Sequence, residues 1–213
     1  MNSDYALITL CIGDNFKKVS ELTVPFMKEY AKKYNIDFII LTEELNFEIK
    51  QYNKFAIFKF LEKYKRICYI DIDILINVNT APNIFEYVPE EKVGILEEGK
   101  YFPERLLQNI LIKENNNLVK KYFNTGVIVF SHRHENLFLL KNCLIDNYAE
   151  QTYINYNISE FEIPVFDIEW RWNNCIFHDP DKKIESFFIH YACLKQTRDL
   201  DLINQDIKLL NLL

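Results

Sequence analysis

The sequence predicts an α/β fold with a Rossmann-like, mostly parallel central sheet flanked by helices. Three short apolar runs are typical of buried strands: residues 5–12, 36–41 and 66–70. Between them lie two stretches of helical periodicity, residues 17–34 and 53–64. This strand–helix alternation is typical of a parallel sheet covered on both faces. The chain has 213 residues, 49% of them hydrophobic, which is enough for one sizeable core, so a single domain is expected.

Both predicted helices of the first half carry local signals. Apolar side chains recur near helical spacing across residues 17–34, and Pro25 is expected to kink or restart that helix. Residues 53–64 form an amphipathic pattern, and Asn53 is expected to cap the start of the helix.

The second half of the chain is less regular. Strands are expected at 92–98, 124–132 and 186–192, and helices at 102–116, over most of 134–158 and in the tail 199–213. The tail stops abruptly on apolar residues, so the chain is interpreted as a possible piece of a longer polypeptide with further domains.

The acidic composition narrows the classes of function. A formal net charge of −6 argues against nonspecific nucleic-acid binding, which needs a basic face. The sequence holds no run of about 18 apolar residues and starts without a signal-peptide pattern. Its 5 cysteines are scattered, as is typical of reduced thiols. These features predict a soluble, cytoplasmic protein with no membrane span and no nucleic-acid partner.

Two acids, Asp71 and Asp73, interrupt the apolar run "YIDIDILI" at 69–76. In a parallel sheet, ligands bind beyond the carboxyl ends of the strands, where these acids lie. Such a pair is often a solvated strand edge or a helix cap. Here two carboxylates beside a buried strand cost desolvation and mutual repulsion, and a divalent cation relieves both. Oxygen ligands suit Mg²⁺ or Mn²⁺, which take further ligands from phosphates, so the pair predicts a metal–diphosphate site.

Further stretches occur in a fixed order around this pair: "ITLCIGDNF" (8–16), "YNKF" (52–55), "YFNTGVIVFSH" (122–132), "EQTYIN" (150–155) and "FIHYACLK" (188–195). Together they resemble the motifs of GT-A fold nucleotide-sugar glycosyltransferases, with the greatest similarity to families 8 and 34. The resemblance covers about residues 5–195. It implies a nucleotide-binding half at about 1–80, a donor-sugar and acceptor half at about 81–195, and a carboxyl-terminal tail at 196–213.

The resemblance implies roles for individual residues. The nucleotide would be bound by Leu10, Cys11, Gly13, Phe16 and Asp71, with Phe16 stacked on uracil. The donor sugar and phosphates would be bound by Lys54, Asn124, Gly126 and Lys195. The metal, Mn²⁺ or Mg²⁺, would be held by Asp71, Asp73 and His190, and the catalytic residues would be Glu150, Gln151 and Asp73. For three of these residues the alternative is a structural role without function: Lys54 as a surface lysine, Glu150 as a helix-surface carboxylate and His190 as a core histidine.

Two motifs depart from the family pattern. Glu150 and Thr152 replace the two acids of the family's Asp-Gln-Asp segment, and Cys193 replaces a glycine. The size and composition are also similar to the amino-terminal domain of a multidomain glycosyltransferase from a large alga-infecting virus, which would imply a viral protein of the host cytoplasm.

The resemblance implies a metal-dependent enzyme of glycan biosynthesis. It would transfer a hexose from a UDP-sugar, such as UDP-glucose, to a hydroxyl of a glycan or glycoprotein, with retention by family analogy. Glu97 or Glu98 as a base would instead give inversion. The alternatives are a non-catalytic nucleotide-sugar-binding module and a Mg²⁺-dependent phosphohydrolase of the Asp-x-Asp type. In such hydrolases the pair follows the first strand, whereas here it follows the third.

Overall fold

The computed structural model describes most of the chain. The described residues are 3–43, 47, 50–104, 120–140, 149–175, 180–192 and 197–212. Within them, no helix has the length and apolar character needed to cross a membrane.

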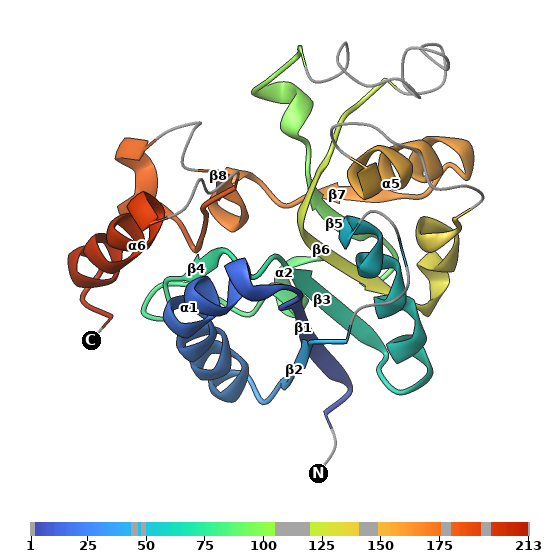
Figure 1. Ribbon diagram of the computed structural model, residues 1–213. Helices are drawn as coiled ribbons and strands as arrows, with labels where there is room; N and C mark the ends of the chain where they lie inside the picture. The colour runs from blue at the N-terminus through green and yellow to red at the C-terminus, as the bar shows by residue number, and fades with distance from the viewer. Residues whose placement is uncertain are drawn as a thin grey trace.

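A six-stranded sheet in the order β2-β1-β3-β6-β5-β7 forms the centre of the molecule (Figure 1). Its strands are β1 (Tyr5–Leu10), β2 (Asp37–Leu41), β3 (Arg66–Ile70), β5 (Val93–Leu96), β6 (Asn124–Ser131) and β7 (Val165–Asp167). Only β6 runs against its neighbours β3 and β5, while the other pairings are parallel. The prediction of an α/β fold with a mostly parallel sheet is therefore confirmed.

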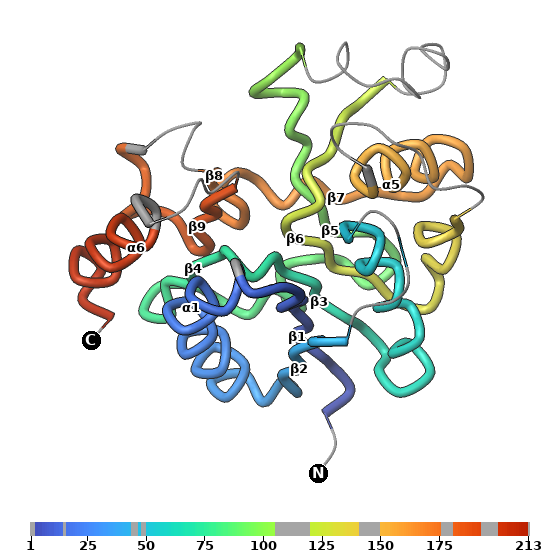
Figure 2. Tube along the Cα trace, in the orientation of Figure 1, coloured from blue at the N-terminus to red at the C-terminus, as the bar shows by residue number. Residues whose placement is uncertain are grey.

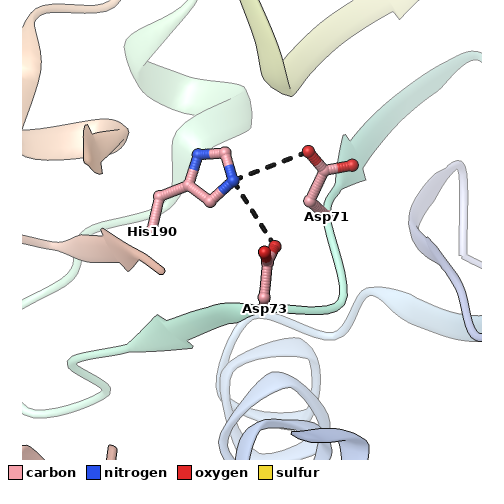
Figure 3. Close-up of side chains that lie close together, drawn as sticks. All are labelled: Asp71, Asp73 and His190. Carbon is pink, nitrogen blue, oxygen red and sulfur yellow. Dashed lines mark ion pairs between the residues drawn. The ribbon is translucent and has the colours of Figure 1, made fainter. Parts of the chain in front are cut away.

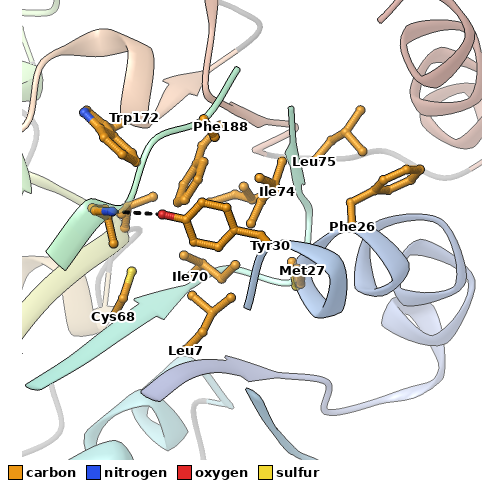
Figure 4. Close-up of a cluster of buried hydrophobic side chains, with 14 of the residues drawn as sticks. Leu7, Phe26, Met27, Tyr30, Cys68, Ile70, Ile74, Leu75, Trp172 and Phe188 are labelled. Atoms are coloured by element: carbon orange, nitrogen blue, oxygen red, sulfur yellow. Dashed lines mark hydrogen bonds between the residues drawn. The ribbon is translucent and has the colours of Figure 1, made fainter. Parts of the chain in front are cut away.

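Helices cover both faces of this sheet. On one face lies α1 (Asp14–Lys33), with α6 (Thr197–Leu209) beside it; on the other lie η1 (Lys50–Glu62), η3 (His132–Phe138) and α5 (Ala149–Glu160) (Figure 1). Because successive strand residues point to opposite faces, Leu7 and Cys68 pack toward α1, whereas Ile8 and Ile67 pack toward η1. Each face thus has its own hydrophobic cluster. Figure 4 shows the α1 cluster, in which buried Tyr30 lies among aliphatic side chains.

A second sheet, made of three short strands, lies on the side of the central sheet that faces α6. It has the order β4-β9-β8, with β4 (Ile74–Ile76), β9 (Phe188–His190) and β8 (Asn174–Cys175). Figure 2 shows β8 and β9 between α6 and the central sheet. The strand expected at 186–192 is confirmed as the shorter β9, although it belongs to this small sheet. The remaining short helices are α2 (Ile84–Tyr87), η2 (Glu98–Lys100), η4 (Trp170–Trp172) and η5 (Pro180–Glu185).

Three local predictions need correction. The helix α1 begins at Asp14 and continues through Pro25 as one helix rather than restarting there. Residues 50–62 form a 3₁₀ helix, and Asn53 lies buried inside it. Because its Nδ2 donates to the Lys50 carbonyl at 2.7 Å, the Asn53 amide acts as a donor inside the helix and is no amino-terminal cap.

The helix expected over most of 134–158 is present as η3 and α5, and residues 141–148 between them lie outside the described part. The helix expected at 102–116 also lies mostly outside it. The tail helix is confirmed as α6.

Candidate active site

Asp71, Asp73 and His190 are brought together by the meeting of the two sheets. Asp71 follows β3, and its backbone N–H donates to the Gly126 carbonyl of β6 at 2.8 Å. Asp73 directly precedes β4, and the antiparallel β4–β9 pairing sets His190 opposite Ile74. As a result, the three side chains point toward one another (Figure 3). His190 Nε2 lies 3.6 Å from Asp71 Oδ2 and 3.4 Å from Asp73 Oδ1.

The donor atoms of this cluster fit a divalent cation. One ligand atom from each of the three side chains lies within 4.8 Å of the others. His190 is buried, whereas Asp71 keeps 27% of its side-chain surface exposed, so a ligand can approach from that side. Burial lowers the pKa of His190, but the Cys175 sulfur and the Asp73 carboxylate outweigh it and hold the pKa well above its usual value. The field that attracts a proton to Nε2 also favours a cation there.

Asn173 orients the imidazole. Its Oδ1 lies 2.8 Å from His190 Nδ1, which places a ring proton on Nδ1 and turns Nε2 toward the carboxylates, where it could bind a metal after losing its own proton. Its Nδ2 donates to Asn124 Oδ1 at 2.8 Å. No role was predicted for Asn173.

Gly126 makes room for the imidazole ring. A Cβ at this position would lie 2.4 Å from His190 Cε1 and 2.6 Å from His190 Nδ1. The group that lies against Gly126 is the His190 ring, and the predicted contact of Gly126 with the donor stays a prediction. Any larger residue at 126 would push His190 away from the two aspartates.

Lys54 is buried at the centre of a second set of charges. Its Nζ lies 2.7 Å from Glu150 Oε1 and 3.3 Å from Asp71 Oδ1, and it donates to the Thr125 carbonyl at 3.1 Å. The alternatives in which Lys54 and Glu150 are surface residues are wrong, because both side chains are buried. Because it contacts both carboxylates, Lys54 connects Glu150 to Asp71 and so to the cluster of Asp71, Asp73 and His190.

The pKa values of this set follow from burial and charge. Burial raises the pKa of Asp71 in isolation, but Lys54 and His190 outweigh it and lower the pKa below its usual value. For Glu150 burial wins over Lys54, and the pKa is raised. Burial opposes the charge on Lys54, yet Asp71 and Glu150 raise its pKa and keep it protonated. Asp71 and Glu150 contact Lys54, and Asp71 and Asp73 lie beside His190, so three carboxylates face two basic side chains and the site favours a further positive charge.

Gln151 and Asn124 lie in a polar network beside these charges. Gln151 Oε1 accepts from the Thr125 backbone N–H at 3.0 Å, and its Nε2 donates to Tyr122 Oη at 2.8 Å. Asn124 Nδ2 donates to the buried Glu98 carboxylate at 3.3 Å. Four of the predicted site segments therefore meet at the carboxyl end of β3.

Comparison with known proteins identifies the family. The model of glycosyl transferase family 8 matches residues 11–157, which is more than half of the chain. The chain belongs to glycosyl transferase family 8. No curated protein matches its sequence.

Solved structures share the fold of this family 8 chain at low sequence identity. The glycosyltransferase involved in glycosylation of the PBCV-1 major capsid has a TM-score of 0.68 at 13% identity, covering 94% of this chain and 99% of that one. The galactosyltransferase LgtC, solved with donor and acceptor sugar analogs, has a TM-score of 0.61 at 13% identity, covering 98% and 96%. A Drosophila β-1,4-galactosyltransferase 7 mutant, in complex with manganese, UDP-Gal and xylobiose, has a TM-score of 0.53 at 14% identity, covering 93% and 79%. At these identities the likeness shows the GT-A fold.

The first loop of this family 8 enzyme lies at the carboxyl end of β1, the same end of the sheet as Asp71. Gly13 has φ +94°, a left-handed conformation that favours glycine, and α1 starts directly after it. Phe16, in the first turn of α1, is 42% exposed. The half-buried Cys11 donates its backbone N–H to the Leu41 carbonyl at 2.8 Å. Leu10 lines a cavity of about 250 Å³ between the β1–β2 edge and η1.

A second cavity lies on the Asn173 side of His190. Its volume is about 180 Å³, and it is lined by Leu96, Tyr101, Phe102, Trp170, Asn173, Asn174 and Lys182. Since Asn173 also contacts His190 Nδ1, this aromatic cavity is one residue away from the imidazole. Lys195, the remaining predicted site residue, lies outside the described residues.

Proposed function

We propose that this family 8 glycosyltransferase transfers a hexose from a UDP-sugar, such as UDP-glucose, to a hydroxyl of a glycan or glycoprotein, and that it needs Mn²⁺ or Mg²⁺. The observation that carries the proposal is the cluster of Asp71, Asp73 and His190. An acidic chain that binds a nucleotide diphosphate needs a cation between like charges, and this cluster has the donor set for one.

The chain's own residues would hold the cation and its surroundings. Oxygens of Asp71 and Asp73 and the Nε2 atom of His190 would be the protein ligands. When bound, the cation supplies charge neutralisation for the diphosphate and for the departing UDP. Lys54 would orient Asp71 and Glu150, because its ammonium group contacts both carboxylates. Lys195 would contact the diphosphate, as the family resemblance implies.

The donor would lie along the carboxyl ends of the strands. Phe16, partly exposed next to Gly13, offers an aromatic face for uracil, with Leu10 and Cys11 beside the base. Asn124, Gly126, Glu150 and Gln151 would surround the hexose near its anomeric carbon. The manganese and UDP-Gal present in the Drosophila relative support the choice of cation and nucleotide.

The acceptor would bind in the aromatic cavity next to the cluster. Tyr101, which is 44% exposed, and Trp170 offer ring faces to a pyranose. An acceptor hydroxyl would attack the anomeric carbon, so that the glycosidic bond forms, the bond to UDP breaks, and the hydroxyl proton passes to the departing diphosphate or to a base. Retention is the expected outcome by family analogy. Glu98, which accepts from Asn124, is the candidate base if the outcome is inversion, and the anomeric proton of the product distinguishes the two by NMR.

The test is a thermal-shift panel of UDP, GDP and CMP, each with and without Mn²⁺, repeated on Asp73→Asn and on Asp167→Asn. Asp167 is a matched control because it is the last residue of strand β7 but pairs with Lys100, outside the cluster. A ligand at a hundredfold excess over its Kd stabilises by about 2.7 kcal/mol, several degrees for a chain of this length.

Of the three nucleotides, only UDP should give a thermal shift that depends on Mn²⁺. This shift should be present in Asp167→Asn and absent in Asp73→Asn. An equal shift with GDP would overturn the uridine assignment, and an unchanged metal response in Asp73→Asn would overturn the metal site. Release of UDP from UDP-glucose with Mn²⁺ then separates the enzyme from a binding module, which would bind UDP without turnover.

A further inference from the structure

We propose that Asp206, on the carboxyl-terminal helix α6, is a positioning residue that fixes His190 between Asp71 and Asp73 by holding Tyr191. Its effect on metal binding rests on the metal site proposed above. Tyr191 and Asp206 lie far along the chain from Asp71 and Asp73, in the part of the molecule where Figure 2 shows α6 beside the small sheet.

Asp206 makes three contacts within a buried cluster. Its Oδ2 accepts from Tyr191 Oη at 2.7 Å, and Lys183 Nζ lies 2.9 Å from Oδ2 and 3.2 Å from Oδ1. Asp206 is 4% exposed, Lys183 is 9% exposed and Tyr191 is fully buried. Three elements therefore share one polar cluster: η5, α6 and the residue after β9.

Tyr191 connects this cluster to the aspartates. It follows His190 directly, and its backbone N–H donates to the Asp73 carbonyl at 3.0 Å. Its main chain is thus bonded to one predicted metal ligand while its side chain is bonded to α6. A shift of Tyr191 would move the peptide unit that carries His190.

The polar cluster has a role beyond attaching the helix. Ile203 and Ile207 of α6 already pack into the core on the α1 side. A buried ion pair often adds no net stability compared with apolar residues of the same volume, whereas it can select one arrangement. Metal ligands tolerate little displacement, so an arrangement that fixes β9 would serve the site.

The test compares two tyrosine hydroxyls. Tyr191→Phe removes the hydroxyl that binds Asp206, and Asp206→Asn weakens the same contact. Tyr30→Phe is the matched control, since the buried Tyr30 hydroxyl donates to the Pro82 carbonyl at 2.7 Å and accepts from the Ile84 N–H at 2.9 Å, away from the aspartates (Figure 4). The readouts are Mn²⁺ affinity by electron paramagnetic resonance and amide hydrogen exchange at Tyr191.

Loss of an outer contact of a metal ligand typically costs 10- to 100-fold in affinity, and this contact is one step further out, so we expect about a three- to tenfold loss of Mn²⁺ affinity. The Tyr191 amide should exchange faster than the β6 amides in Tyr191→Phe and in Asp206→Asn. Tyr30→Phe should lower the Tm without either change. If both tyrosine variants lower the Tm alike and leave exchange at Tyr191 unaltered, the positioning role is overturned.

The two proposals fail in different ways. A wild-type chain that binds no Mn²⁺ would overturn the metal site, and exchange at Tyr191 would still decide the role of Asp206. A wild-type chain that binds Mn²⁺, with unchanged affinity in Tyr191→Phe and Asp206→Asn, would overturn the role of Asp206 and leave the metal site standing.

Discussion

Two buried lysines, Lys54 and Lys183, lie in opposite electrostatic settings. Lys183 faces one carboxylate, Asp206, whose second partner is the neutral Tyr191 hydroxyl. Lys54 faces two carboxylates, Glu150 and Asp71, and Asp71 in turn contacts His190. The first set is balanced, one charge against one, whereas the second, with Asp73 included, has three carboxylates against Lys54 and His190.

This difference separates a structural ion pair from a site that accepts a ligand. A balanced buried pair with its hydrogen bonds made needs no further partner. An unbalanced set raises some pKa values and lowers others, as burial raises that of Glu150 while Lys54 and His190 lower that of Asp71. The excess carboxylate charge beside Lys54 is the physical reason to expect a cation there and none beside Lys183.

The largest expected effect comes from removing each ammonium group. Lys54→Met and Lys183→Met should each lower the free energy of unfolding by about 3–5 kcal/mol, since each leaves buried carboxylate charge without its partner. Urea denaturation at neutral pH, with a chelator present, measures the loss.

A second substitution sharpens the contrast between the lysines. Asp206→Asn added to Lys183→Met should recover most of the loss, whereas Glu150→Gln added to Lys54→Met should recover less, because Asp71 and Asp73 remain. Mg²⁺ should stabilise the Lys54→Met/Glu150→Gln chain. It should stabilise the Lys183→Met/Asp206→Asn chain somewhat less than wild type, because Asp206→Asn weakens the metal site. Equal recovery of the two double variants would remove the distinction between balanced and unbalanced sets.

A smaller effect is expected from substituting Asn173, which contacts the His190 ring at Nδ1, whereas the aspartates lie at Nε2. Asn173→Ala frees the His190 ring to turn and should weaken Mn²⁺ binding about 10- to 100-fold. Asn174→Ala is the matched control, because Asn174 is an equally buried neighbour that donates to Ser186 Oγ at 2.8 Å. With Mg²⁺ bound, the ¹⁵N shifts of His190 should report the Nδ1–H form in wild type and Asn174→Ala and a mixture of forms in Asn173→Ala. A single Nδ1–H tautomer in all three would show that Asn173 does not orient the ring.

Much of the fold could be read from the sequence because strands buried on both faces appear as continuous apolar runs. The strands β1, β3 and β6 are such runs, and all have buried side chains. The two-residue β8 and three-residue β4 are too short to leave a periodic signal. They exist because pairing with β9 joins distant segments, which no local pattern records.

The candidate site shows the same division. Asp71 and Asp73 could be found because carboxylates in an apolar run are costly, so they demand an explanation. Asn173 and Asp206 could not, because an asparagine or aspartate in a polar stretch is unremarkable until its partner is known. Lys54 was expected to reach the donor, and its contacts with Glu150 and Asp71 depend on where η1 and α5 pack. The roles of Leu10, Cys11, Gly13, Phe16 and Lys195 stay predictions.

The smallest expected effect is a pH dependence that comes from the unbalanced site. Burial raises the folded-state pKa of Glu150 above its ordinary value of 4.5, although Lys54 opposes the rise. The folded chain therefore binds more protons than the unfolded chain just above that value, so this residue's contribution to stability falls as pH rises through the window up to the folded-state pKa. The slope is at most about 1.4 kcal/mol per pH unit. Asp71, with its lowered pKa, acts in a separate window, where its contribution is lost as pH falls below its ordinary value of 3.8.

Glu150→Gln should therefore remove the decline above pH 4.5, measured by urea denaturation at intervals up to neutral pH with a chelator present. Gln151→Ala is the control, because Gln151 lies beside Glu150 and makes polar contacts with Thr125 and Tyr122 but carries no titratable group. It should lower stability at every pH and keep the wild-type slope. If Glu150→Gln keeps that slope too, Glu150 is fully ionised across the window, and Lys54 balances its charge as completely as Lys183 balances Asp206.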